Sequence, residues 1–245
     1  MAKRVGFPAR IHIDGYELTG DVGALNEIST PRAVLDVTDI SKAGIERLLG
    51  HGDGMLEFLA FFNDAGSQMH SRMKLLPTTD VDVTFHLGDT IGSPGFGLRA
   101  KQINYDWRRA TDGSLLGTVR CEANGTPLEW GVMLTAGRRT DTAATNGASQ
   151  DNAASSASGL AGWLQVFSFT GTSVTLTIQE SSDDGGLDPW AAKLTFAAAS
   201  AVGTQRVTAT GTVERYLRVA STGTFTNALF TVLVRRGTAQ DQEAY

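Results

Sequence analysis

Residues 98–134, LRAKQINYDWRRATDGSLLGTVRCEANGTPLEWGVML, decide the fold class of this chain. Apolar and polar side chains alternate in three runs, residues 98–107, 116–122 and 128–134, as they do in strands with one buried face. The pairs Asp112-Gly113 and Asn124-Gly125 separate these runs, and glycine readily takes the positive φ that tight hairpin turns need. The stretch therefore predicts an antiparallel meander of three strands.

Four more strands and two short helices are expected before this stretch. The strand-like runs are residues 9–13, 33–37, 55–62 and 81–87. One helix is expected at residues 41–49, with Ser41 as its N-cap and Gly50 as its stop. The other is expected at residues 67–76, where three apolar side chains at helical spacing, Met69, Met73 and Leu76, indicate core packing.

A stretch of small and polar residues divides the chain. Residues 139–159 show no hydrophobic period and too little apolar surface to pack, which is typical of an Ala/Ser/Asn-rich linker. The linker separates an N-terminal domain, residues 1–138, from a C-terminal domain, residues 160–237. Alternating runs separated by glycine-rich turns predict a compact β-sandwich for the second domain. Residues 238–245 are expected to form a polar C-terminal tail.

Composition excludes several classes of protein. The chain has 245 residues, 41% hydrophobic and 19% charged, which suits a folded protein with room for two domains. A net charge of −5 provides no general attraction to phosphate, which argues against a dedicated nucleic-acid reader. No run approaches the roughly 18 apolar residues of a membrane span, so no membrane insertion is expected. The single cysteine, Cys121, is interpreted as a small core residue.

No catalytic, cofactor-binding or metal-binding residue can be identified, and the chain is not expected to be an enzyme. The four histidines, His12, His51, His70 and His86, have no metal-ligand spacing, and no serine lies in a nucleophile elbow. His12 and His86 lie in strands beside polar residues and are expected to be exposed or hydrogen-bonded structural residues. The acidic turn 183–188 has enough oxygen ligands for calcium but lacks EF-hand spacing, so a solvated turn is favoured.

Several segments occur in an informative order. They are residues 33–41, residues 55–64 with the end Phe61-Phe62-Asn63-Asp64, the segment around Pro94, residues 100–106, and Asn124-Gly125 leading to Glu129-Trp130-Gly131. This order resembles the major tail tube proteins of long-tailed, siphovirus-type bacteriophages. Residues 179–185, Trp190 and residues 211–219 resemble the outer sandwich domains attached to some of these proteins. The resemblance covers most of the chain except the linker and the tail.

The resemblance implies a mainly β fold, with an N-terminal tail-tube-like β-sandwich or barrel with short helices and a C-terminal Ig-like β-sandwich. It implies a structural subunit of a long flexible tail, whose hexameric rings stack into a tube around the tape-measure protein. Tail-terminator and tail-tip proteins are further implied partners, and double-stranded DNA passes through the lumen during viral genome ejection. The subunit is then expected in the virion, and in the host cytoplasm during assembly. Residues 15–30 and 64–79 are expected as long loops that contact neighbouring rings.

Three other interpretations stay open. A tail-terminator or baseplate ring shares the tube fold but caps the tube. A carbohydrate-binding or adhesin-like module predicts a stable monomer. Host surface glycans are candidate ligands of the C-terminal domain through Trp163 or Trp190, although core positions are favoured for both. A β-rich hydrolase needs two facing carboxylates, and the sequence identifies no such pair.

Overall fold

Strands make up most of the computed structural model, which describes residues 8–237. In this range the strands are interrupted by one 3-10 turn, η1 (Thr19–Asp21), and one short helix, α1 (Met69–Met73). The predicted mainly β fold is confirmed. The predicted polar tail, residues 238–245, lies outside the described residues.

The chain forms two compact units, and each unit uses separated segments of sequence. Unit 1 comprises Met1–Gly20, Asp82–Gly97 and Glu129–Tyr245, and unit 2 comprises Asp21–Val81 and Leu98–Leu128. The predicted division into residues 1–138 and 160–237 is therefore corrected. The physical reason is long-range strand pairing: β10 (Glu129–Met133) belongs by sequence to the first predicted domain, yet it pairs with β16 (Tyr216–Arg236).

Much of the predicted linker, residues 139–159, forms strands instead. β11 (Arg139–Asp141) and β12 (Thr145–Asp151) both pair antiparallel with β16. Most side chains of β12 are exposed, so backbone hydrogen bonds rather than apolar burial hold this strand in place. The Arg139 guanidinium donates to both carboxylate oxygens of Asp141 and to the Val219 carbonyl, which fixes β11 to the sheet.

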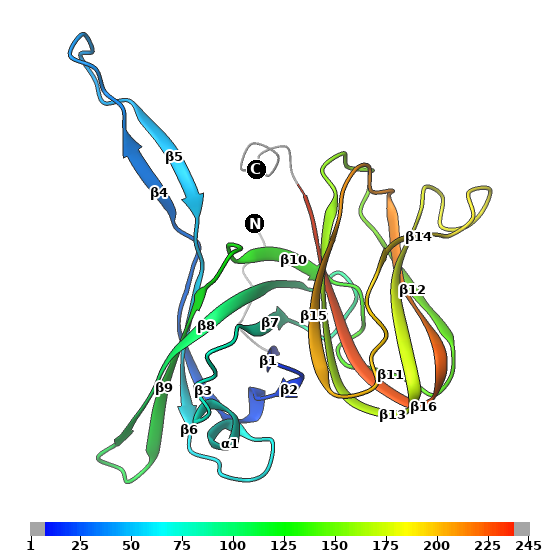
Figure 1. Ribbon diagram of the computed structural model, residues 1–245, viewed down its shortest axis with the longest axis horizontal. Coiled ribbons are helices and arrows are strands. Elements are labelled where there is room, and N and C mark those ends of the chain that lie inside the picture. Colours follow the sequence, from blue (N-terminus) through cyan, green and yellow to red (C-terminus); the bar gives the residue numbers. More distant parts are fainter. Residues whose placement is uncertain (1–7, 238–245) are drawn as a thin grey trace. The chain divides into compact units, whose positions relative to one another are not determined.

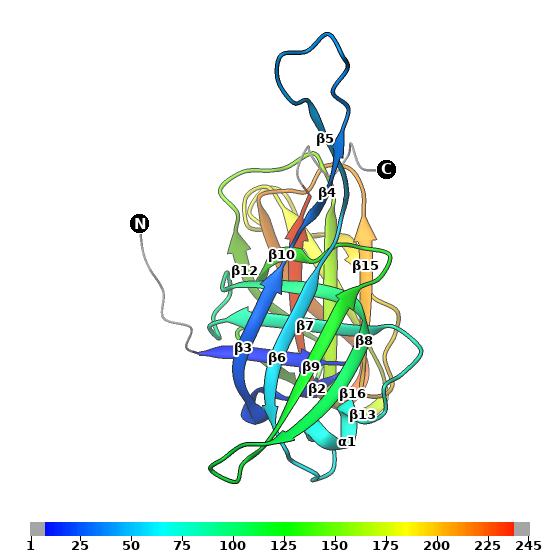
Figure 2. The same cartoon turned by 90° about the vertical axis from the view of Figure 1, so that its left-hand side faces the viewer.

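Unit 2 is built on one antiparallel sheet of four strands in the order β3–β6–β9–β8 (Figure 2). The strands are β3 (Val22–Ser29), β6 (Met55–Phe61), β9 (Leu115–Ala123) and the part of β8 (Pro94–Arg109) that follows Gly97. Leu56, Phe58 and Ala60 alternate along β6 with more exposed residues and are fully buried. α1 lies against this sheet, because the Gln102 side chain on β8 donates to the Met73 carbonyl.

The first turn of the predicted meander is confirmed and the second is corrected. β8 and β9 form a hairpin, in which Gly113 has a φ of 91° and Asp112 accepts from the Ser114 backbone N–H and hydroxyl. Asn124-Gly125, in contrast, does not turn the chain back onto β9. Instead, β10 pairs with residues 94–97 of β8, whereas β9 pairs with residues 100–109 of the same strand.

Of the two predicted helices, only the second exists, and it is shorter than expected. Residues 47–49 of the first, expected helix belong to β5 (Arg47–Gly52), which pairs with β4 (Arg32–Asp36). Ser41 caps no helix, because its backbone N–H and hydroxyl both donate to the Asp39 carboxylate. The second helix is limited to α1 because Ser67 and Leu76, near its two ends, have positive φ values of 67° and 41°.

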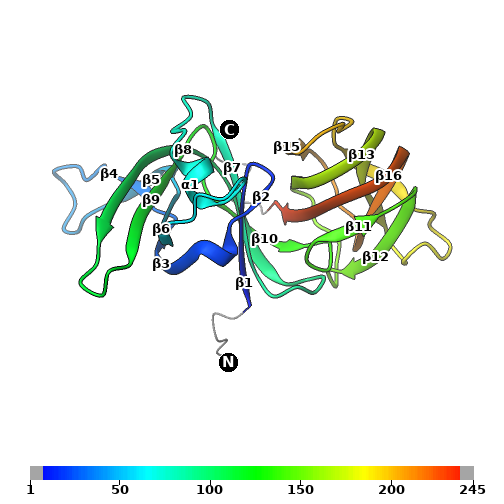
Figure 3. The ribbon, with the colours of Figure 1, turned by 90° about the horizontal axis from the view of Figure 1, so that it is seen from below.

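Unit 1 is organised around two long strands, β13 (Leu160–Ser181) and β16, which pair along almost their whole length (Figure 3). β15 (Gly203–Ala209) pairs with the first part of β13, and β14 (Ala191–Thr195) pairs with its last part. Bulges lie between Val166 and Ser173, around Gly171, and separate the two parts of β13. Both parts contribute to a single core, for example Leu164 and Val166 from the first and Leu176 and Ile178 from the second. The C-terminal sandwich of residues 160–237 stays a prediction: these strands share one core, and residues of β11 and β12, outside the predicted range, pair into the same sheet.

A smaller group of strands completes unit 1. β1 (Ala9–Ile13) pairs with β2 (Tyr16–Glu17) and with β7 (Val81–Leu87). The Gln165 side chain of β13 accepts from the Gly15 backbone N–H and donates to the Asp82 carbonyl. This buried amide therefore ties both the β1–β2 turn and the start of β7 to the sandwich.

Glu129 is the centre of a buried charged network in unit 1. Its carboxylate accepts from the Trp163 indole N–H at 2.8 Å and from Nε and Nη2 of Arg206 at 2.9 and 2.7 Å. Arg235 adds a longer contact of 3.4 Å. The network joins β10, β13, β15 and β16, so loss of the carboxylate affects four strands.

Glu129→Ala is expected to lower the free energy of unfolding by about 3–5 kcal/mol, because Arg206 would remain buried without its counter-charge. Asp151→Ala is the matched control: the Arg215–Asp151 pair has the same 2.7 Å contact but is solvent-exposed, so a far smaller loss is expected. Urea denaturation measures both values. Equal losses in the two variants would contradict the assigned role of Glu129.

Candidate functional site

The most unusual surface of unit 2 is a two-stranded arm formed by β4 and β5 (Figure 1). These two strands form a sheet of their own, and in Figure 1 they extend well beyond the ends of β3 and β6. Seven of the arm's apolar side chains are exposed: Val34, Leu35, Val37, Ile40, Ile45, Leu48 and Leu49. An isolated two-stranded hairpin is at best marginally stable in water, and clustered exposed apolar residues mark interaction surfaces.

Polar contacts near the tip hold the arm together without a core. The Asp36 carboxylate accepts from the backbone N–H and hydroxyl of Thr38, and the Thr38 hydroxyl in turn accepts from the Glu46 backbone N–H. Lys42 and Glu46 form an ion pair at 2.9 Å. These contacts stabilise the end of the hairpin, so the exposed apolar side chains lie on a folded pair of strands.

The unit 2 sheet has two open edges. β3 pairs with β6 on one side, and residues 103–109 of β8 pair with β9 on one side; among the described strands neither stretch has a strand partner on its other side. Unpaired strand edges carry free N–H and C=O groups that readily pair with another chain. Exposed apolar residues accompany both edges: Leu25 lies on β3, and Ile103 lies on β8.

Aromatic residues gather beside the β8 edge. Phe62, His70, Tyr105 and Trp107 form consecutive ring contacts with centroid separations of 4.4 to 5.7 Å, and the Tyr105 hydroxyl lies 3.2 Å from His70 Nδ1. The buried Asp21 carboxylate positions this cluster, since it accepts from the Asn63 side chain and the Met69 backbone N–H. Residues 64–79 thus hold α1 and adjoin an aromatic surface. Residues 15–30, expected as a loop, form β2, η1 and β3 instead.

One face of the unit 2 sheet is polar. Cross-strand pairs on this face include Glu57 opposite Arg120 and Glu122 opposite Lys101. Arg120 also contacts Glu122 at 2.7 Å. Acidic and basic side chains therefore alternate on this face.

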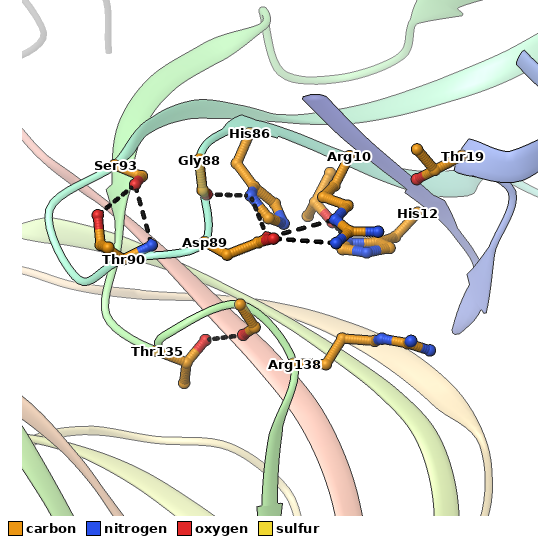
Figure 4. Close-up of polar contacts among 12 residues, drawn as sticks. Arg10, His12, Thr19, His86, Gly88, Asp89, Thr90, Ser93, Thr135 and Arg138 are labelled. Carbon is orange, nitrogen blue, oxygen red and sulfur yellow. Dashed lines mark hydrogen bonds and ion pairs between the residues drawn. The ribbon is translucent and has the colours of Figure 1, made fainter. Parts of the chain in front are cut away.

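Unit 1 contains a polar pocket with a cavity of about 260 Å³ (Figure 4). Its lining consists of Arg10, His12, Glu17, His86, Asp89, Ala136, Gly137 and Arg138. Arg10 makes a two-point contact with Asp89, with Nε 3.3 Å and Nη2 2.9 Å from the two carboxylate oxygens. Arg138 Nε lies 2.9 Å from Glu17 Oε2. Each of these arginines is therefore matched by a carboxylate.

The two histidines of the pocket are buried side by side, with ring centroids 5.3 Å apart. Burial lowers the pKa of His12, and burial followed by the proximity of His12 lowers the pKa of His86 to about 4. For Glu17, burial opposes ionisation, but the contacts with His12 and Arg138 outweigh it and the pKa falls to about 2. At neutral pH the pocket thus holds two neutral imidazoles between two ion pairs.

The other residues singled out from the sequence lie in ordinary structural environments. Trp163 is buried in the core, and Trp190 is half-buried with the Arg218 guanidinium 4.3 Å from its ring centroid, so one face of that ring is occupied. Asp183 accepts from the backbone N–H groups of Gly186, Leu187 and Asp188, which makes the acidic turn self-capped. The expectation of a solvated turn fits this geometry. Cys121 is buried, as predicted.

Within residues 8–237, no three His, Cys, Asp or Glu side chains are arranged to hold a metal ion. In the same range, no helix has the length and apolar character needed to cross a membrane. The pairing of β1 with β7 brings His12 and His86 together across 74 residues, which no local sequence signal indicates. The exposed arm was equally hidden, because its apolar residues at positions 45, 48 and 49 are spaced as in an amphipathic helix.

Comparison with known proteins gives matches of fold alone. No protein-family model and no curated protein matches the sequence. A chain from the virion of a native gene transfer agent particle matches with 17% identity and a TM-score of 0.43, over 52% of this chain and 98% of that one. The Dit protein of phage SPP1, described as a hub of the adsorption apparatus, matches with 14% identity and a TM-score of 0.35, over 94% of this chain and 99% of that one.

A third match is a chain of the phage p2 baseplate in its activated conformation, with 7% identity and a TM-score of 0.34, over 94% of this chain and 98% of that one. All three are components of phage or phage-like particles. At these identities and TM-scores they establish neither an activity nor a partner for this chain.

Stability is expected to depend on pH through His86. Its folded pKa of about 4 lies below the ordinary 6.5, so between these values the unfolded chain binds the proton more readily. The free energy of unfolding should therefore decrease as the pH falls from 6.5 to 4, by up to about 3 kcal/mol for this group. Glu17 acts in the same direction, but only below its ordinary value of 4.5.

His86→Gln is expected to reduce the slope of the stability profile between pH 6.5 and 4.5, as measured by urea denaturation at a series of pH values. A smaller slope of the same sign should remain, because burial lowers the pKa of His12 as well. His51→Gln, which changes an exposed histidine on β5, should keep the profile of the unchanged protein. Parallel profiles for the unchanged protein and the His86 variant would show that this imidazole is not the titrating group.

Proposed function

We propose that this chain is a non-enzymatic structural subunit of a bacteriophage tail, and that it assembles into rings through the sheet of unit 2. The observation that carries the proposal is the pair of open edges on that sheet together with the exposed apolar arm. In a monomer the N–H and C=O groups of the strand edges have only water as hydrogen-bond partners, and the apolar side chains of the arm are exposed to water. A second copy of the chain pairs the edges and covers the apolar side chains.

The geometry of the edges favours a head-to-tail contact. The strands β3, β6, β9 and β8 alternate in direction, so β3 and β8 run antiparallel to each other. If β3 of one copy pairs with residues 103–109 of β8 in the next, the alternation continues without interruption across the joint. Because the two edges are different surfaces, the contact is heterologous, and such contacts close into a ring or continue as a filament.

The arm supplies the second contact of the proposal. Its exposed leucine, isoleucine and valine side chains are buried when it lies on a copy in the next ring. Burial of apolar surface contributes roughly 25 cal/mol per Å². The arm therefore favours stacking of rings, whereas the strand edges favour closure of each ring.

The resemblance to tail tube proteins supplies the remaining parts of the proposal. These are six copies per ring, a tape-measure protein in the lumen, terminator and tail-tip proteins at the tube ends, and passage of double-stranded DNA during ejection. The subunit is then a component of the virion. A single ring at the terminator or baseplate uses the same two edges and is the alternative within this proposal. The carbohydrate-module alternative is less favoured, because Trp163 is buried and Arg218 lies over one face of the Trp190 ring.

The test is to raise the protein concentration in steps while mass is followed by light scattering and particles are imaged by negative-stain electron microscopy. Closed rings of uniform diameter support the proposal, stacked tubes favour the tube subunit, and single rings favour a terminator or baseplate ring. A monomer that persists in the presence of a tail-tip initiator and tape-measure protein would contradict it.

The double variant Ile40→Asp, Leu48→Asp is expected to raise the concentration needed for stacking by at least about tenfold, because each change places a charge in a contact that must become dry. Leu187→Asp is the matched control, since Leu187 is fully exposed and belongs to unit 1 rather than to the arm. Thermal unfolding of the monomer should be similar in all three proteins. Equal stacking by the arm variant and the control would remove the arm from the proposed interface.

A further inference from the structure

Two groups of exposed apolar side chains lie near opposite ends of the unit 2 sheet. The arm joins the sheet where β6 begins, at Met55, whereas β6 ends at Phe61, near α1 and the β8–β9 hairpin (Figure 2). Phe62 and Leu115 lie at this second end and are 39% and 45% exposed. Unit 2 therefore carries the apolar arm at one end and another apolar surface at the other.

The second surface lies on the face of the sheet that α1 contacts. The contact is made at Gln102 of β8, which lies opposite Cys121 of β9. Leu115 points to the same face as Cys121, because side chains alternate along a strand. Beside it, the Phe62 backbone N–H donates to the Leu115 carbonyl, and the Phe62 and Trp107 ring centroids are 5.1 Å apart. This surface, the end patch, consists of Phe62, His70, Tyr105, Trp107 and Leu115.

We propose that the end patch binds the arm of a second copy of this chain, located in the next ring. Such a contact rests on the stacking of rings in the proposed function and identifies the surface that receives the arm. The aromatic rings of the patch offer flat apolar area on which exposed aliphatic side chains of the arm, such as Ile40 and Leu48, can pack.

The two surfaces match in size and charge. The twenty residues 30–49 are all exposed, and one side of a standard interface uses about 20–30 residues. On the receiving side lie residues 61–68 and 105–115, none of which is buried. Residues 30–49 include three basic and three acidic side chains, and the receiving segments include two basic and three acidic ones. Neither surface has a net charge large enough to oppose the burial of its apolar side chains.

The separation of the two surfaces along β6 gives the contact a direction. An arm that binds a second arm uses both arms, so the association stops at a pair. An arm that binds an end patch leaves a free patch on one copy and a free arm on the other, so the same contact repeats along a stack. Two different surfaces at opposite ends therefore favour the arm–patch contact over an arm–arm contact.

The direct test mixes two variants that each lack one of the two surfaces. The arm variant is Ile40→Asp, Leu48→Asp, and the patch variant is Phe62→Asp, Leu115→Asp. Assembled separately, each should need at least about tenfold more protein to stack than the unchanged chain. Their mixture should form complexes of about twice the mass but no longer stacks, because only one arm and one patch remain to bind each other. Sedimentation velocity measures these masses.

Each other outcome contradicts the contact in a distinguishable way. Stacking of the unchanged protein without pairing in the mixture overturns this contact and leaves the proposed function in place, as does a patch variant that stacks like the unchanged chain. Single rings that never stack also overturn this contact alone. No assembly of the unchanged protein, even with a tail-tip initiator and tape-measure protein, overturns both. If thermal unfolding shows that the patch variant does not fold, Leu115→Asp alone takes its place.

Disulfide formation locates the contact. Cys121 is the single cysteine of the chain and is buried, so introduced cysteines can be oxidised selectively. Ile40→Cys mixed with Leu115→Cys is expected to give a covalent mixed dimer under mild oxidation. The matched control replaces Ile40→Cys by Leu187→Cys, which should give none. Equal yields of mixed dimer in the two experiments would overturn the proposal.

Discussion

The antiparallel pairing of β13 with β16 is the contact on which unit 1 depends. It extends from Leu160 opposite Arg236 to Ser181 opposite Tyr216, and five other strands attach to one or the other member of the pair. The bulges around Gly171 let both long strands serve two layers of the sandwich. As a result, this one pair of strands supplies much of the core of unit 1, and β16 also provides the edge with which the polar strands β11 and β12 pair.

Unit 2 differs from unit 1 in what it leaves exposed. Its sheet is covered by α1 on one face, but within the described chain two strand edges have no strand partner and the apolar side chains of the arm are exposed. Folding removes such groups from water wherever the chain allows it. On the β4–β5 hairpin these apolar side chains stay exposed, and binding of a further chain would bury them. The strands of unit 1 therefore share a common core, whereas unit 2 leaves two strand edges and an apolar arm exposed.

The elements that could be predicted from the sequence are the strands whose side-chain pattern is typical of a β-strand. The strands at residues 9–13, 55–61 and 81–87 were predicted almost residue by residue. On β6 one buried face imposes the alternation, whereas β7 is buried on both faces and was indicated by its β-branched and aromatic residues. The helix at residues 41–49 was wrong because the same apolar spacing arises on an exposed hairpin, whose apolar side chains are not packed in a core. Residues 139–151 were missed because backbone pairing with β16 requires no apolar side chains. The pocket stayed hidden because Arg10 and His86 meet only through long-range register.

The interleaved path of the chain has a consequence for biosynthesis. Every segment of unit 2 lies between residues 21 and 128, whereas unit 1 waits for β16 before β10, β11, β12 and β13 have a common neighbour. The sticky arm and the open edges therefore emerge from the ribosome well ahead of the strand that completes the sandwich. Under the proposed assembly, neighbouring nascent chains on one polysome expose the arm and the open edges before unit 1 is complete, so the timing of translation affects whether they assemble or aggregate.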